Sequence, residues 1–241
     1  MIVDIFIPCY IDQFYPGTAQ SMVKVLERLN CGVNYNIEQT CCGRPAFEDG
    51  YWDHCKEVGE KLIREFQEDR YIVCPASTCV ATVKNQYASI FHNTSLHNEY
   101  KMVQKHMYEF SDFLVNVLNA SDLGARYPGK AVFLDSCSAV HDLGIKEAPR
   151  MLLSNVRDLE MLNMGNSSLP CCGLGGGLDR KDEKLTVQMA EEVIKAATNE
   201  GANIIISTDY DCLMHLNGVI HKNNYNLKTA HIADVLATGW Q

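Results

Sequence analysis

The sequence predicts an α/β protein built from two pseudo-symmetric repeated modules, each with a parallel sheet flanked by helices. Short apolar runs of strand type alternate with helical patterns along the chain, and this alternation is typical of parallel sheets with right-handed crossovers. The order of these segments repeats after about 130 positions, which indicates an internal duplication. The cysteines recur in the same order in both halves.

The first module is predicted to span residues 1–125 and to open with a strand at residues 2–7. A helix follows, because Met22, Val25, Leu26 and Leu29 fall on one helical face. The remaining elements expected in this module are a strand around 35–38, a helix at 55–66, a strand at 71–74 and a helix at 79–87.

The second module is predicted to span residues 126–241 and to repeat this pattern. Its expected elements are a strand at 131–134, helices at 149–162 and 183–198, a strand at 203–207 and a helix that begins near Cys212. Gly124, Pro128 and Gly129 indicate a loop where the modules join.

The composition favours a cytoplasmic protein with neither a membrane span nor a nucleic-acid partner. The 241 residues carry a net charge of −9, which repels polyanions. No apolar stretch approaches the roughly 20 residues that cross a bilayer, and "MIVDIFIPCY" lacks the basic start of a secretory signal. Eleven cysteines are many for such a chain, and the count is odd. Metal binding or redox chemistry is therefore favoured over a disulfide framework.

Eight of these cysteines form matching sets of four. Each half contains a Cys-Cys-Gly triplet, and Cys171 follows Cys41 by 130 positions. The predicted site residues are Cys9, Cys41, Cys42 and Cys79 in the first module and Cys137, Cys171, Cys172 and Cys212 in the second. Ligands of parallel α/β folds gather beyond the carboxyl ends of strands. Since these cysteines follow predicted strands, each set is expected to converge at such an edge.

Three functions suit four convergent thiols. An iron–sulfur cluster takes four thiolates, and the glycine after each pair permits the turn that brings neighbouring cysteines to one site. Structural zinc also accepts four cysteines, although the usual C-x2-C spacing is absent. Thiol–disulfide chemistry is the third possibility. Cys31 and Cys55 are expected to be packing residues, and Cys74, close to Cys79, is a possible extra ligand of the first module.

The doubled pattern resembles the cysteine-rich CCG domain family. Cys9…Cys41-Cys42-Gly43…Cys79 and its second copy are similar to the motifs of the cysteine-rich subunit of heterodisulfide reductase and of the glycolate oxidase iron–sulfur subunit. The length of the chain and the segments "PCCGLGGGLD", "STDYDCLMHLNG" and "AHIADVLATG" are most similar to the lactate utilisation A proteins of this family. The family's additional CxxC cysteine is missing, because Ala76 and Asp209 stand at those positions.

The resemblance implies an iron–sulfur electron-transfer subunit of a complex that oxidises L-lactate to pyruvate. It implies one 4Fe–4S cluster per module, with the eight paired cysteines as ligands, and leaves cubane and non-cubane clusters open. The implied partners are a ferredoxin-like subunit of the lactate utilisation protein B type and a subunit of the protein C type. The alternatives are a heterodisulfide-type thiol reductase subunit and a zinc-bound or metal-free scaffold. No flavin or nicotinamide motif is present, which favours a subunit of an oxidoreductase complex over a complete enzyme, and no catalytic residue stands out.

Overall fold

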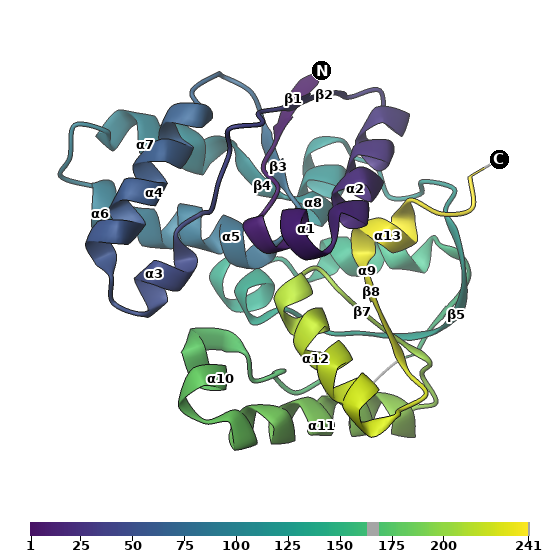
Figure 1. The fold of residues 1–241 in the computed structure, drawn as a ribbon. Helices are drawn as coiled ribbons and strands as arrows, with labels where there is room; N and C mark the ends of the chain where they lie inside the picture. Colours follow the sequence, from purple (N-terminus) through teal and green to yellow (C-terminus); the bar gives the residue numbers. More distant parts are fainter. Residues whose placement is uncertain (163–168, 241) are drawn as a thin grey trace. The chain divides into compact units, whose positions relative to one another are not determined.

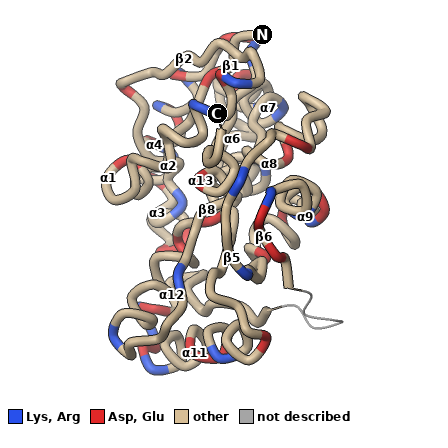
Figure 2. Tube along the Cα trace, turned by 90° about the vertical axis from the view of Figure 1, so that its right-hand side faces the viewer, with Lys and Arg blue, Asp and Glu red and all other residues tan. Residues whose placement is uncertain are grey.

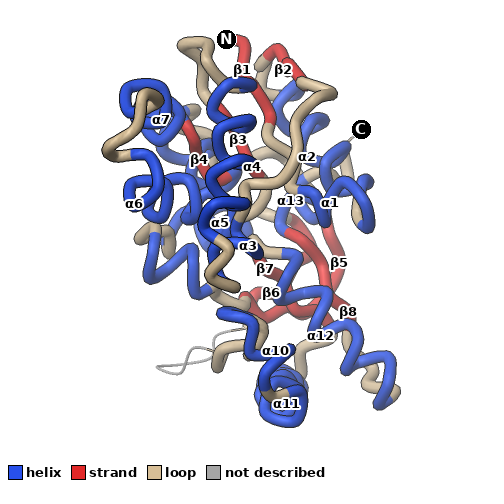
Figure 3. The backbone as a smooth tube through the Cα atoms, turned by 60° about the vertical axis from the view of Figure 1, so that its left-hand side comes forward, coloured by secondary structure: helices blue, strands red, loops and turns tan. Residues whose placement is uncertain are grey.

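The computed structural model describes residues 1–162 and 169–240, which divide into two compact units, Met1–Phe113 and Leu114–Gln241 (Figure 1). Each unit contains a four-stranded sheet, with strand orders β2-β1-β3-β4 and β6-β5-β7-β8. Every pairing is parallel, and helices flank the strands of each unit (Figure 3). The predicted fold class, two repeated α/β modules with parallel sheets, is confirmed.

The first unit follows the predicted alternation of strands and helices. Its elements are β1 (Ile2–Ile5), α1 (Cys9–Phe14), α2 (Pro16–Arg28), β2 (Gly32–Tyr35), α3 (Arg44–Glu48), α4 (Trp52–Glu65), β3 (Ile72–Cys74), α5 (Ser77–Ala81), η1 (Thr82–Gln86), α6 (Tyr87–Phe91), α7 (His97–His106), β4 (Met107–Glu109) and α8 (Phe110–Asp112). The helix α2 begins with a proline, whose fixed φ suits the first turn.

Close packing and one buried ion pair hold the first sheet in place. Gly59 of α4 lets the ring of Phe91 approach, since a Cβ there would lie 3.0 Å from that ring. Asp4, a buried residue of the central strand β1, accepts two hydrogen bonds of 3.0 Å from Arg70 and one of 2.6 Å from Asn34. These bonds compensate the cost of burying the carboxylate.

The second unit contains η2 (Phe113–Val117, which crosses the division), β5 (Arg126–Phe133), η3 (Ser138–Asp142), α9 (Glu147–Ser154), β6 (Arg157–Met161), η4 (Gly175–Gly177), α10 (Leu178–Lys181), α11 (Glu183–Asn199), β7 (Ile204–Ser207), α12 (Tyr210–Asn223), β8 (Lys228–His231) and α13 (Ile232–Leu236). One core cluster packs α11 and α12 against the sheet through Val193, Ile194, Leu213 and Leu216.

The helix predicted at 149–162 is wrong beyond Ser154. Residues 157–161 form the edge strand β6, which pairs with β5. Ion pairs join the two strands, Lys130 with Glu160 at 3.1 Å and Arg126 with Asp158, and both signs of charge lie along them (Figure 2). This strand has a weak signal in the sequence, because only Leu159 and Met161 are apolar and the other three residues are charged. The strand predicted around 35–38 ends earlier, at Tyr35.

Candidate functional site

In the first unit, four cysteines meet beyond the carboxyl ends of the strands. Cys9 begins α1, just after β1, and Cys79 lies in the first turn of α5, after β3. Cys41 and Cys42 occupy the loop between β2 and α3. The Sγ atoms of Cys42 and Cys79 are 3.4 Å apart, and the side chain of Cys9 is hydrogen-bonded to that of Cys41. The four thiols therefore form a continuous chain of contacts.

The second unit repeats this arrangement. Cys137 lies just before η3 and Cys212 in the first turn of α12. The Sγ atoms of Cys137 and Cys171 are 3.5 Å apart, and those of Cys172 and Cys212 are 2.8 Å apart. Each predicted set of four is thus brought together within its own unit.

A left-handed glycine makes each Cys-Cys pair possible. Gly43 and Gly173 have φ values of 83° and 87°, which only glycine adopts at little cost. Their N–H groups donate to the Sγ atoms of Cys41 and Cys171 at 3.3 Å and 3.4 Å. With this turn, Cys41 contacts Cys9, which follows β1, and Cys42 contacts Cys79 of α5. In the same way, Cys171 contacts Cys137, which follows β5, and Cys172 contacts Cys212 of α12.

The contacts between thiols lower the pKa of the first cysteine of each Cys-Cys pair. Hydrogen bonds from Cys42 and Cys9 lower the pKa of Cys41 to about 3. Hydrogen bonds from Cys137 and Cys172 lower the pKa of Cys171 to about 2. The donor thiols of Cys9 and Cys137 have raised pKa values for the complementary reason, since each loses a hydrogen bond when it ionises. In the metal-free protein, Cys41 and Cys171 are therefore thiolates at neutral pH, and Cys9 and Cys137 stay protonated.

The two sets differ in their access to solvent. Cys9 and Cys137 are both exposed, and Cys42 and Cys172 are both buried. Cys41 is half-buried and Cys79 is buried, whereas the matching Cys171 is exposed and Cys212 is half-buried. The site of the second unit is thus the more open to a reagent or a partner.

Sequence reasoning did not identify two neighbours of the first Cys-Cys-Gly turn as part of the site. The buried hydroxyl of Tyr87 donates to the Cys42 carbonyl at 3.0 Å. Cys55 is fully buried, as expected for a packing residue, but it packs against Gly43. Burial and the charge on Cys41 raise the pKa of Cys55 to about 11. Neither role has a local sequence signal, because both depend on residues far along the chain.

Cys74 and two charged residues also lie near the sets. Cys74 is fully buried, and its Sγ donates to the carbonyl of Ala76 at 3.6 Å. Arg44, beside the first turn, forms an ion pair with Glu48 at 2.8 Å. The charge of His141 contributes to the lowered pKa of Cys171, so this residue lies near the second set.

The donor set of each unit, four cysteines, is of a type that binds a metal or a cluster. Within residues 1–162 and 169–240, no three Cys, His, Asp or Glu side chains are arranged to hold one metal ion. The closest Sγ–Sγ contact, 2.8 Å, is shorter than the roughly 3.8 Å between thiolates on tetrahedral zinc, and thiolates that each bind a different iron of a cluster lie further apart still, so either group would separate these thiols on binding. Four cysteines linked by a chain of contacts, one of them with its Sγ bound by a backbone N–H, match the ligand type of iron–sulfur clusters and also that of structural zinc.

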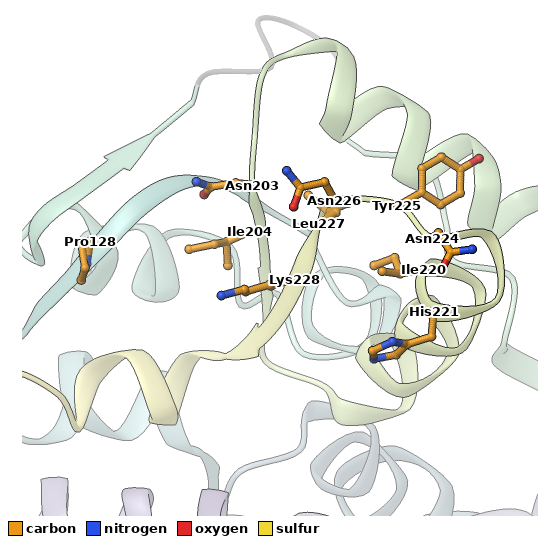
Figure 4. A pocket seen from close by; sticks show the side chains of 10 residues that line it. All are labelled: Pro128, Asn203, Ile204, Ile220, His221, Asn224, Tyr225, Asn226, Leu227 and Lys228. Atoms are coloured by element: carbon orange, nitrogen blue, oxygen red, sulfur yellow. The ribbon is translucent and has the colours of Figure 1, made fainter.

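A separate cavity of about 640 Å³ lies in the second unit, at the opposite edge of its sheet (Figure 4). It is lined by residues at the amino ends of β7 and β8, among them Asn203, Ile204 and Lys228, and by the end of α12 at His221. None of the paired cysteines lines it.

The chain belongs to the cysteine-rich (CCG) domain family, which matches residues 3–84 and 131–217. All eight paired cysteines and both glycine turns fall within these two ranges. For the described part of the chain, none of the helices combines the length and apolar composition needed to cross a bilayer.

Among the curated relatives, the chain is similar to lactate utilization protein A. It is 36% identical to that protein of Exiguobacterium sp. over 242 residues, covering 98% of this chain and 97% of the relative. It is 37% identical to that of Geobacillus thermodenitrificans over 237 residues, covering 98% of both chains. Glutamate racemase from Francisella tularensis is a solved structure with 9% identity over 98% of this chain and 77% of that chain. Its TM-score of 0.40 supports no inference about fold or function.

Proposed function

We propose that the chain is an iron–sulfur electron-transfer subunit of a cytoplasmic complex that oxidises L-lactate to pyruvate. Its partners would be a ferredoxin-like subunit of the lactate utilisation protein B type and a subunit of the protein C type. The observation that carries the proposal is the pair of four-cysteine sets, each in contact within its unit. The similarity to lactate utilization protein A over 98% of the chain supports the substrate.

In this proposal each unit holds one 4Fe–4S cluster. The ligands would be Cys9, Cys41, Cys42 and Cys79 in the first unit and Cys137, Cys171, Cys172 and Cys212 in the second, with Cys74 as a possible extra ligand. The bound group would accept and release single electrons.

The chain's own groups prepare these sites. The N–H groups of Gly43 and Gly173 stabilise negative charge on Cys41 and Cys171. Burial of Cys42 and Cys79 excludes water from one side of the first site. The exposed Cys137 and Cys171 make the second site the more accessible to a partner that delivers or takes electrons.

Metal analysis of anaerobically prepared protein tests the proposal. Two clusters require about eight irons and eight acid-labile sulfides per chain, and an EPR signal should appear in one redox state. The double variant Cys137→Ser/Cys171→Ser should keep about half of the iron. Cys31→Ser is the matched control, because Cys31 is buried outside both sets, and it should keep all of it.

A colourless wild-type protein without iron or sulfide would refute the cluster and favour a zinc-bound or metal-free scaffold. The lactate step is tested separately. Reconstitution with the two partner subunits should give lactate-dependent reduction of an artificial acceptor. That activity should be lost in the double variant and retained in Cys31→Ser.

The contact between Cys137 and Cys171 also suits a second function, reduction of a small-molecule disulfide. The exposed Cys171 thiolate would attack one sulfur and displace a thiolate, and Cys137 would then attack the mixed disulfide and release the second thiol. The Cys137–Cys171 disulfide left behind would be reduced by two electrons from the ferredoxin-like partner, with uptake of protons. If this is the function, Cys171→Ser abolishes disulfide reduction in protein that binds no iron.

A further inference from the structure

The side chain of Gln39 joins the two loops that carry Cys9 and Cys41. Its Oε1 accepts a hydrogen bond of 2.7 Å from the backbone N–H of Ile7. Its Nε2 donates to the carbonyl of Ile5 at 3.2 Å and to that of Asn36 at 2.9 Å. Both ends of one amide are therefore used, and they bind backbone groups of two different segments.

The side-chain amide of Gln39 makes the next hydrogen bonds along β1, beyond the last residue of β2 that pairs with it. The register of β1 with β2 ends at the pair Ile5 and Tyr35. In a parallel ladder, the next residue of β2 would donate to the carbonyl of Ile5 and accept from the N–H of Ile7. The Gln39 side chain supplies that donor and that acceptor in place of a peptide group. The backbone is thereby released to form the turn that presents Cys41.

We propose that Gln39 is a positioning residue that sets the separation of the Cys9 and Cys41 thiols. Ile7 lies two residues before Cys9, and Gln39 lies two residues before Cys41. Two residues of chain leave little freedom between each thiol and the amide, so the hydrogen bonds to Ile5 and Ile7 hold both loops together. Ile7 is buried, and its N–H would lack this acceptor without Gln39.

In the second unit, other contacts take the place of the Gln39 hydrogen bonds. By the repeat spacing, Leu169 replaces Gln39, and it is a core residue. Asp135 replaces Ile7 and forms a bidentate ion pair with Arg150 of α9, with N–O distances of 2.8 Å and 2.6 Å. The positioning role of Gln39 is thus confined to the first unit, and the second unit serves as an internal control.

The test is thiol cross-linking in reduced, cluster-free, full-length protein. Dibromobimane joins two neighbouring thiols covalently, and peptide mapping by mass spectrometry gives the rates of the Cys9–Cys41 and Cys137–Cys171 products from one sample. Gln39→Leu, which installs the residue of the second unit, should slow the first product about tenfold, as expected for loss of hydrogen bonds that leaves a buried N–H unpaired. The second product should form at the wild-type rate.

Gln39→Glu separates positioning from general destabilisation. It keeps the acceptor for Ile7 and loses the donor for Ile5, so its rate should lie between those of Gln39→Leu and the wild type. If Gln39→Leu does not fold, the Cys9–Cys41 cross-linking rate of Gln39→Glu alone tests the proposal. Gln67→Leu, at an exposed glutamine after α4, should leave both rates unchanged. An unchanged Cys9–Cys41 rate in the folded Gln39 variants, or an equal loss of both products, overturns the proposal.

The inference deepens the proposed function, but this measurement does not depend on it. Slower Cys9–Cys41 cross-linking in protein that never binds iron would leave Gln39 a positioning residue and would refute only the cluster. If clusters do bind, Gln39→Leu should also change the EPR spectrum of a Cys171→Ser/Cys172→Ser background, in which only the first site remains.

Discussion

Replacing Gly43 with alanine tests the physical basis of the first Cys-Cys-Gly turn. Two costs add at this position. The φ of 83° is left-handed, which costs a residue with a Cβ about 1–2 kcal/mol. The new Cβ would also lie 3.0 Å from the Cys55 Sγ and 3.2 Å from the Cys55 carbonyl oxygen. Because that oxygen belongs to the backbone of α4, it moves only with the helix, and such overpacking costs about 1–3 kcal/mol.

Gly50→Ala is the matched control. Gly50 has a φ of 81°, but its Cβ would meet no atom within 4 Å. It therefore carries the conformational cost alone, about 1–2 kcal/mol, whereas Gly43→Ala should lose about 2–5 kcal/mol in total. Equilibrium urea unfolding of the metal-free protein, followed by circular dichroism, measures both free energies. Equal losses for the two variants would show that packing against Cys55 does not shape the turn.

Three further predictions concern single groups. Burial raises the pKa of Glu109 to about 7 from 4.5, against hydrogen bonds from Ser111 and Asp112. The folded state thus keeps a proton that the unfolded state loses, and stability falls between pH 4.5 and 7 by about 3 kcal/mol. Glu109→Gln should remove this fall in urea titrations at several pH values, and a parallel pH dependence in both proteins would contradict the assignment. Tyr87→Phe should cost about 1–3 kcal/mol because the Cys42 carbonyl loses its donor, whereas Tyr51→Phe, at an exposed ring, should leave the melting temperature unchanged. In reduced metal-free protein, iodoacetamide should alkylate Cys171 at nearly the same rate at pH 8 and pH 5, since its pKa is about 2. An ordinary thiol slows about 1000-fold over that range, so a similar slowing at Cys171, followed by mass spectrometry, would show that it is not a stable thiolate.

The sequence predicted best those elements whose signal is local. The helix at 183–198 was predicted from one apolar face, and α11 spans Glu183–Asn199. The strand at 203–207 is a short buried run, and β7 covers Ile204–Ser207. Both elements were predictable because the pattern of apolar residues that defines them lies within a few neighbouring positions of the sequence.

Short and polar edge strands were not predictable in the same way. β4 and β8 have three and four residues, too few to show a period. β6 has only two apolar residues, Leu159 and Met161, and its charged side chains form exposed ion pairs with β5. The pairing energy of such strands comes from residues that are distant in the sequence, so a local pattern does not contain it.

The sequence by itself determined which eight thiols form the two sets, because a duplicated spacing of cysteines is visible without a structure. Only the tertiary structure decided which thiol faces which. Cys41 faces Cys9 and Cys42 faces Cys79 at a place where Gly43 turns left-handed against α4 and the Gln39 amide binds the end of β1. The contacts between thiols and that of Gln39 with Ile7 join segments more than 30 positions apart, and they exist only once the sheet and the helices have packed.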